Sequence, residues 1–307
     1  MRLALIGQQA FGRAALDKFR ERGDTVAGVF VAPEKPGTKP DPLRARAEEL
    51  GIPVFQFQRY SAEEPLATLR GLAVDIGVMA YVTQFAPQAF VTVPKHGMIQ
   101  FHPSLLPLHR GPSSINWAII QGRTKTGLTI FRPTDGLDEG AVLLQKEVAV
   151  TPDDTLGSVY FDKIFPLGIK ALLEAADAVM AGRARESVQD ESQASYEGWC
   201  RDAEARIDWA KHADQIYNLI RGCNPAPGAW TKLGEQKLQI FDAAKIPVRT
   251  FGMVKGFKPG QVTKVSEKSF TVCAHGGLID VQRCRIGDGP KIAGNEAGIA
   301  AGTMLGT

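Results

Sequence analysis

A histidine and an aspartate, 36 positions apart, are the residues best suited to acid–base chemistry in this sequence. His102 follows the short run 98–101 and stands between Pro103 and the proline at 107, which stiffen the loop and hold the imidazole. Asp138 lies in the turn 134–140, whose glycines permit close backbone approach to a ligand. A carboxylate that orients an imidazole and holds its proton is an arrangement used in catalysis. The alternatives are a structural histidine and an ordinary turn aspartate.

Other catalytic patterns fit the sequence poorly. It contains no GxSxG, HExxH or GxxxxGK[ST] motif and no metal-ligand spacing. Ser104 beside a proline is a poor nucleophile, but it could bond a ring nitrogen of the histidine or cap the following helix. The turn Gly7–Gly12 resembles a dinucleotide loop but lacks the middle glycine of GxGxxG. A tight turn into a helix is therefore favoured over a nucleotide site.

The composition is that of a globular chain. The 307 residues are 44% hydrophobic and 22% charged, with a net charge of +3. This charge suits a small anionic ligand and is too weak to argue for nucleic acid. No run approaches the roughly 20 apolar residues of a membrane span, and the N-terminus lacks the features of a signal peptide. Four cysteines without CxxC spacing favour a reduced, cytoplasmic, metal-free protein.

The first half of the chain alternates apolar strands with helices. We expect strands over residues 2–6, 25–31, 52–55, 74–80 and up to His102, with a helix that follows Gly12 through about Arg22 and helices over 43–51 and 62–72. This alternation predicts βαβ units and a parallel sheet. Ligands of such sheets bind at the carboxyl ends of the strands, which is where His102 falls.

The second half has a different pattern. A helix over 113–122, strands over 127–132 and 141–150, and helical spacing over 155–182 precede the polar stretch 183–203, which we interpret as a linker. After a short helix near 212–221, short alternating strands with Gly and Asn turns predict a small antiparallel barrel. We therefore expect two domains, residues 1–200 and 201–307.

Three motifs connect the chain to a known family. HPSLLPLHRG (102–111), SSINWAI (113–119) and DGLDEGAVLLQKE (135–147) resemble the formyltetrahydrofolate-dependent formyl-transfer family, and the resemblance extends to IRGCNPAPGAW (220–230) and the C-terminal strands. Members include methionyl-tRNA formyltransferase and the N-terminal hydrolase domain of 10-formyltetrahydrofolate dehydrogenase. The resemblance implies an α/β fold: a Rossmann-like, parallel-sheet formyltransferase domain followed by a small antiparallel, OB-like β-barrel domain.

The resemblance also implies a catalytic set. The family signature is an Asn, any residue and a His, together with the Asp of the GLDxG loop, so His102 and Asp138 match. Gln100 replaces the Asn; it keeps the carboxamide but extends it by about 1.5 Å, one methylene. A donor to a developing oxyanion must be placed accurately, so Gln100 either donates after a backbone adjustment or takes no part. The hydrolase branch also lacks this Asn.

The expected formyl donor is 10-formyltetrahydrofolate, with no metal. Water or an amine attacks the formyl carbon. His102, joined by Gln100 if its amide reaches, stabilises the oxyanion, and Asp138 acts as the base or orders the water and the imidazole. The resemblance places the pterin between the loops 81–87 and 138–140. The expected substrate-binding residues are Tyr81, Phe85, Ser104, Leu105, Leu106, Arg110, Leu137, Glu139 and Gly140.

The acceptor stays open between water, the amine of an initiator tRNA and an amino-sugar nucleotide. The tRNA-formylating branch usually has a basic residue directly after SLLP, where this chain has Leu108. SYEGW (195–199) and IRGCNPAPGAW look closer to the hydrolase domain. The dehydrogenase adds a carrier module and an aldehyde-dehydrogenase unit, for which 307 residues leave no room, so we expect no dehydrogenase activity from them. A folate-binding module that has lost catalysis is the alternative from another class.

Overall fold

The computed structural model describes residues 1–248 and 250–306. The chain divides into two compact units. The first comprises residues 1–112, 126–148 and 161–197, and the second comprises 113–125, 149–160 and 198–307. The helix expected over 113–122 thus groups with the C-terminal part of the chain, and the boundary near residue 200 stays a prediction.

The first unit is built on a seven-stranded sheet with the order β3-β2-β1-β4-β5-β6-β7. The strands are β1 (Arg2–Gly7), β2 (Thr25–Phe30), β3 (Val54–Phe55), β4 (Ile76–Ala80), β5 (Met98–His102), β6 (Lys125–Phe131) and β7 (Val142–Ala149). The first five pair in parallel, as predicted. Most of their residues are buried, because helices cover both faces of a parallel sheet.

One strand departs from the predicted parallel arrangement. β6 pairs antiparallel with β5, so that His102 lies opposite Thr129 and Gln100 opposite Phe131. The apolar run of β6 shows that it is buried but carries no information about its direction. The fold is therefore a mixed Rossmann-like sheet, which confirms the predicted class and corrects this one strand.

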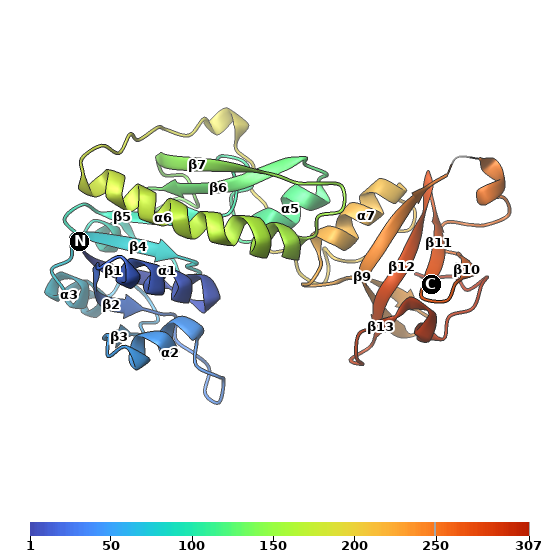
Figure 1. Cartoon of the computed structure of the whole chain (residues 1–307), viewed down its shortest axis with the longest axis horizontal. Coiled ribbons are helices and arrows are strands. Elements are labelled where there is room, and N and C mark those ends of the chain that lie inside the picture. Colours follow the sequence, from blue (N-terminus) through green and yellow to red (C-terminus); the bar gives the residue numbers. More distant parts are fainter. Residues whose placement is uncertain (249, 307) are drawn as a thin grey trace. The chain divides into compact units, whose positions relative to one another are not determined.

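Helices enclose the sheet on two sides. α1 (Gln9–Glu21) packs against α2 (Pro42–Glu49) and α6 (Phe165–Met180), and α6 also contacts β4 and β5 (Figure 1). α3 (Glu63–Gly71) and α4 (Gln88–Val91) contribute to a second core around Phe30, Tyr60 and Phe90. Tyr60 and Phe90 stack with their ring centroids 4.6 Å apart. The stretch expected to be one helix from 155 to 182 begins as a π-helix, Ser158–Ile164, before α6.

The glycine-bearing turn after β1 is completed by a carboxylate of the protein itself. Asp41 is buried and accepts hydrogen bonds from the backbone N–H of Gln9, the first residue of α1, at 2.8 and 3.0 Å. It also caps α2 through the N–H of Leu43, at 2.9 Å. The N-terminus of a helix attracts anions, and here the side chain of Asp41 supplies one. The turn thus has an internal partner, in agreement with its interpretation as a structural turn.

The second unit is an antiparallel sheet with helices packed against it. Its strands follow the order β10-β11-β12-β9-β8, and β13 pairs with β12. They are β8 (Ala229–Leu233), β9 (Gln236–Pro247), β10 (Val262–Val265), β11 (Phe270–Ala274), β12 (Gly277–Ile286) and β13 (Ile292–Ala293). α7 (Ala213–Gly222) packs against β9 and β12, and α5 (Ser114–Ile120) packs against α7. The prediction of a small antiparallel β domain is confirmed.

Replacing Asp41 by alanine should destabilise the first unit by about 2 kcal/mol, because two helix N-termini lose their cap at once and each cap contributes about 1 kcal/mol. Urea denaturation followed by circular dichroism measures this. Asp177→Ala is the control, because it removes an exposed carboxylate paired with Arg22 and should change stability by about 0.5 kcal/mol or less. Equal stabilities of the two variants would show that Asp41 is not a shared cap.

Candidate active site

His102 ends β5 and is almost fully buried. Its Nε2 lies 2.9 Å from the carbonyl oxygen of His109, and its Nδ1 lies 3.5 Å from Oδ2 of Asp138. A carbonyl only accepts, so Nε2 must carry a hydrogen and donate it. Nδ1 is therefore the nitrogen that faces the carboxylate of Asp138. The structure brings the two predicted catalytic residues together, with the imidazole orientation set by a backbone carbonyl.

Asp138 is buried, and the protein holds one of its two carboxylate oxygens. Oδ2 accepts a hydrogen bond from the backbone N–H of Gly111 at 2.9 Å, in addition to its contact with His102. No residue in the described ranges donates a hydrogen bond to Oδ1. One oxygen of the carboxylate is thus held by the protein, and the other is left to interact with a reactant.

Gln100 lies on the same face of β5 as His102, because side chains two apart in a strand point the same way. The two residues are separated by roughly 6.6 Å along the strand. The side chain of Gln100 is half-buried, and it has no hydrogen-bond partner among the residues that the structure describes. Its amide is therefore available as a donor beside the imidazole.

Side chains of β6 and β7 hold the loop after His102 in place by hydrogen bonds to its backbone. Thr129 Oγ1 donates to the carbonyl of Ser104 at 2.7 Å and accepts from the N–H of Leu106 at 3.1 Å. Gln145 adds a hydrogen bond to the carbonyl of Leu106 at 2.7 Å. Ser104 was expected to bond the imidazole or cap a helix; instead its hydroxyl donates to the carbonyl of Leu108 at 2.7 Å. It stabilises the loop, since both ring nitrogens of His102 already have other partners.

Large apolar side chains are exposed in the loops on either side of this pair. Tyr81, Phe85 and Leu137 are 42%, 63% and 55% exposed. Tyr81 comes two residues after Met79, which pairs with Gln100, so it lies at the same strand edge as His102. The backbone N–H of Gln88 donates to Asp135 at 2.9 Å and joins the loop 81–87 to the loop 132–141. Exposed apolar side chains in neighbouring loops are typical of a ligand-binding surface.

The remaining predicted binding residues differ in accessibility. Leu105 is half-buried, Leu106 and Gly140 are buried, and Glu139 is exposed. Their contact with a substrate stays a prediction.

Arg110 is fully buried and is engaged by the protein. Its guanidinium donates to both carboxylate oxygens of Glu191, at 2.6 and 2.9 Å, and to the hydroxyl of Tyr196. The bidentate pairing raises the pKa of Arg110 and lowers that of Glu191. The contribution of this pair to stability is therefore lost as the pH falls through the lowered pKa of Glu191. These contacts give Arg110 a structural role; its contact with substrate stays a prediction.

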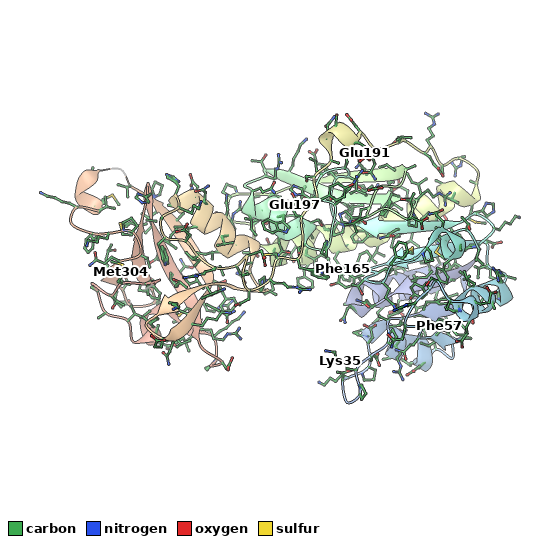
Figure 2. All side chains as sticks on the ribbon, turned by 180° about the vertical axis from the view of Figure 1, so that it is seen from behind. Lys35, Phe57, Phe165, Glu191, Glu197 and Met304 are labelled. Atoms are coloured by element: carbon green, nitrogen blue, oxygen red, sulfur yellow. The ribbon has the colours of Figure 1, made fainter. Side chains whose placement is uncertain are left out.

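The residues that bind Arg110 belong to a segment that sequence reasoning missed. Residues 187–197, here called the 187–197 segment, were expected to be part of a linker. They instead pair with the loop after His102 and with the start of β7: Ser195 O accepts from the N–H of Arg110 at 2.9 Å, and Ser187 pairs with Val142. Glu191 and Glu197, both labelled in Figure 2, lie on this segment. Its polar, aperiodic composition contained no signal of these contacts, which are made by hydrogen bonds rather than by an apolar face.

Two glycines allow the loops to meet. A Cβ on Gly140 would lie 1.4 Å from the carbonyl oxygen of Arg132, and one on Gly111, whose φ is +109°, would lie 2.3 Å from that of Glu197. Both clashes are with backbone, which a side-chain rotation cannot relieve. The backbone N–H of Gly111 also donates to Asp138, so the close approach that this glycine allows brings the donor to the carboxylate.

Within residues 1–248 and 250–306, no group of three or more His, Cys, Asp or Glu side chains is arranged to hold a metal ion. Over the same ranges, no helix combines the length and apolar character that crossing a bilayer requires.

The comparison with protein families identifies the chain. The model described as "Formyl transferase" matches residues 1–175, and that described as "Formyl transferase, C-terminal domain" matches residues 200–298. The chain therefore belongs to the formyl transferase family, and the predicted resemblance is confirmed. It is an enzyme family of folate-dependent formyl transfer.

Curated relatives fall in two groups. The chain is 41% identical to human cytosolic 10-formyltetrahydrofolate dehydrogenase over 278 residues, which is 86% of this chain but only 30% of that protein. It is 34% identical to the methionyl-tRNA formyltransferase of Geobacter metallireducens over 282 residues, 90% of this chain and 88% of that protein. The chain thus spans about a third of the length of the dehydrogenases and most of the length of the tRNA enzyme.

Solved structures share the fold. HypX from Aquifex aeolicus, in complex with tetrahydrofolic acid, aligns with a TM-score of 0.68 at 17% identity over 96% of this chain and 46% of its own. WlaRD, a sugar 3N-formyl transferase, aligns with a TM-score of 0.69 at 16% identity over 92% of this chain and 97% of its own. At these identities the likeness concerns the fold alone.

Gly140→Ala should destabilise the first unit by about 3 kcal/mol, because the new methyl group forces the backbone of the Asp138 loop away from Arg132. Thermal or urea unfolding tests this. Gly71→Ala is the matched control: it ends α3, has no atom within 4 Å of the added Cβ, and should leave stability unchanged or raise it by about 0.5 kcal/mol. A Gly140 variant as stable as the control would contradict the assigned close approach.

Proposed function

We propose that this chain transfers the formyl group of 10-formyltetrahydrofolate to water, releasing formate and tetrahydrofolate. The observation that carries the proposal is the buried His102–Asp138 pair, in which one carboxylate oxygen is held and the other is left to a reactant. Family membership and the tetrahydrofolate bound by HypX support a folate as the formyl donor.

Asp138 is the proposed base. As water attacks the formyl carbon, Oδ1 takes a proton from it, while Oδ2 stays fixed by Gly111 and His102. A C–O bond forms, and the carbonyl becomes a tetrahedral oxyanion. The proton on Oδ1 is then delivered to N10 of the folate as the C–N bond breaks, so N10 leaves as a neutral amine. This sequence balances protons without any additional group.

His102 and Gln100 are the proposed stabilisers of the oxyanion. The carbonyl of His109 and the carboxylate of Asp138 set the orientation of the His102 imidazole, and we propose that the positive edge of its ring faces the developing negative charge. The amide of Gln100, on the same face of β5, has its N–H groups free to donate. The proposed wall for the pterin consists of Tyr81, Phe85 and Leu137, with Leu105, Leu106, Glu139 and Gly140 around them. The fully buried Ser104 and Arg110 would support these loops from behind.

Two observations favour water over an amine as acceptor. The chain is 41% identical to 10-formyltetrahydrofolate dehydrogenase and 34% identical to methionyl-tRNA formyltransferase. Leu108 also stands where the tRNA-formylating branch usually has a basic residue. The second candidate is methionyl-tRNA formyltransferase, which the almost complete coverage of that relative supports. An amino-sugar nucleotide is the third acceptor to test. A folate-binding module without catalysis is the non-enzymatic alternative, and Gln100 is its main argument.

Asp138→Asn and His102→Ala should each lower the turnover of 10-formyltetrahydrofolate by about 10²–10⁴-fold, because they remove the base and its partner. The measurement is the spectroscopic appearance of tetrahydrofolate with water alone. Asp135→Asn is the matched control in the same loop: it keeps the oxygen that accepts from Gln88 and should retain activity. Full activity in Asp138→Asn would remove the pair from the mechanism, and tight binding without turnover in the wild type would indicate the module.

Gln100→Leu should lower kcat about 10²-fold if the amide donates to the oxyanion. Gln100→Asn should raise it if the additional methylene strains the donor. Gln56→Leu, an exposed glutamine whose amide contacts the carbonyl of Ala32, is the control. Wild-type rates in both Gln100 variants as well as in the control would show that Gln100 takes no part in the reaction.

The acceptor is determined by comparing water, initiator Met-tRNA and an amino-sugar nucleotide at equal salt. We expect formate release to be independent of added amine. Formyl transfer to the tRNA or the sugar that outpaces formate release would instead select that acceptor and reject the hydrolase proposal.

A further inference from the structure

Gln189, on the 187–197 segment, uses both ends of its buried side-chain amide. Its Nε2 donates to the carbonyl oxygens of Asp138 and Gly140, 2.8 and 2.7 Å away. Its Oε1 accepts from Nη2 and Nε of Arg110, at 2.8 and 3.2 Å. One side chain thus holds the backbone on both sides of Glu139 and is itself held by a buried guanidinium.

The backbone that Gln189 holds is strained at Asp138. The φ of Asp138 is +56°, in the left-handed region that non-glycine residues occupy only when their surroundings enforce it. Relaxation of this torsion would swing the carboxylate away from His102 and from the N–H of Gly111. The two hydrogen bonds from Gln189 are direct restraints against this movement.

The chemistry of this position calls for a carboxamide. Two carbonyl oxygens need donors and a guanidinium needs an acceptor, and a primary amide supplies both from one side chain. Arg110 is fixed in turn by Glu191, and Tyr196 donates to Glu139 at 2.9 Å. A continuous set of hydrogen bonds therefore leads from the 187–197 segment to the loop that contains Asp138.

We propose that Gln189 is a positioning residue for formyl transfer: it holds Asp138 in the conformation that keeps its carboxylate on His102, and Arg110 acts through Gln189 rather than on the substrate. The proposal rests on the proposed function, because it assigns Gln189 a role through Asp138. It extends that function to a segment which contributes no side chain to the proposed reaction.

Two variants of Gln189 separate its contacts. Gln189→Glu keeps an oxygen for Arg110 but replaces the donor to the two carbonyls by a second oxygen, and Gln189→Leu removes both contacts. We expect kcat to fall about 10- to 100-fold in each, because small displacements of a catalytic group have costs of this size, while KM for 10-formyltetrahydrofolate changes less than about threefold. The pH dependence of kcat should also shift, since it reports the His102–Asp138 pair.

Gln193→Ala is the matched control. It removes an exposed glutamine on the same segment whose amide contacts only Asp190, at 2.8 Å, and should have wild-type kcat and pH profile. A purely structural role for Gln189 predicts a lower unfolding temperature with an unchanged kcat per folded molecule and an unchanged pH profile. That result would overturn the proposal.

A readout without activity distinguishes this proposal from the proposed function. The amide proton of Gly111 donates to Asp138, so its NMR resonance reports the position of the carboxylate. We expect it to shift in both Gln189 variants and to stay in place in Gln193→Ala. The resonance could shift in the Gln189 variants while the wild-type protein turns over no formyl donor. That outcome would reject the proposed function but not the contact by which Gln189 positions Asp138. An unshifted resonance together with unchanged kcat would reject the positioning.

Discussion

The site depends on a single carboxylate oxygen. Oδ2 of Asp138, in the loop after β6, accepts the N–H of Gly111 and contacts the imidazole of His102. His102 ends β5, and Gly111 lies in the loop that follows it. This shared acceptor fixes the relative position of two segments that are distant in sequence. The two carboxylate oxygens also differ in function under the proposed mechanism: Oδ2 binds the protein, and Oδ1 takes the proton from the reactant.

Maintaining that contact requires backbone geometry that would be unfavourable elsewhere. Tyr81, His109 and Asp138 all have positive φ, and each such residue costs of order 1–3 kcal/mol unless its surroundings enforce the conformation. Gly111 and Gly140 let the backbones of neighbouring loops approach where any side chain would clash. The concentration of such residues at one strand edge is the structural counterpart of a preorganised site.

Two of the molecule's carboxylates illustrate how the same group serves different purposes. Asp41 fills the N-terminus of α1, the position at which a dinucleotide-binding fold holds a phosphate, and thereby turns a potential anion site into a structural joint. Asp138 is equally buried but retains one unbonded oxygen. The usual ligand site of a Rossmann-like sheet is thus closed at β1, and the proposed chemistry lies at the ends of β4 and β5.

The order of residues was enough to predict the alternating strands and helices, the change to an antiparallel domain, and the family. Local apolar periodicity and the motifs around His102 and Asp138 are properties of short segments, and the family assignment is confirmed. The reversed direction of β6, the partners of each ring nitrogen and the role of the 187–197 segment were not predictable. They depend on which distant backbone groups come within hydrogen-bond distance, and the local sequence pattern carries no information about that. Gln189 shows this most clearly: its sequence neighbours are those of a solvated linker, and only the folded chain brings its amide between Arg110 and Asp138.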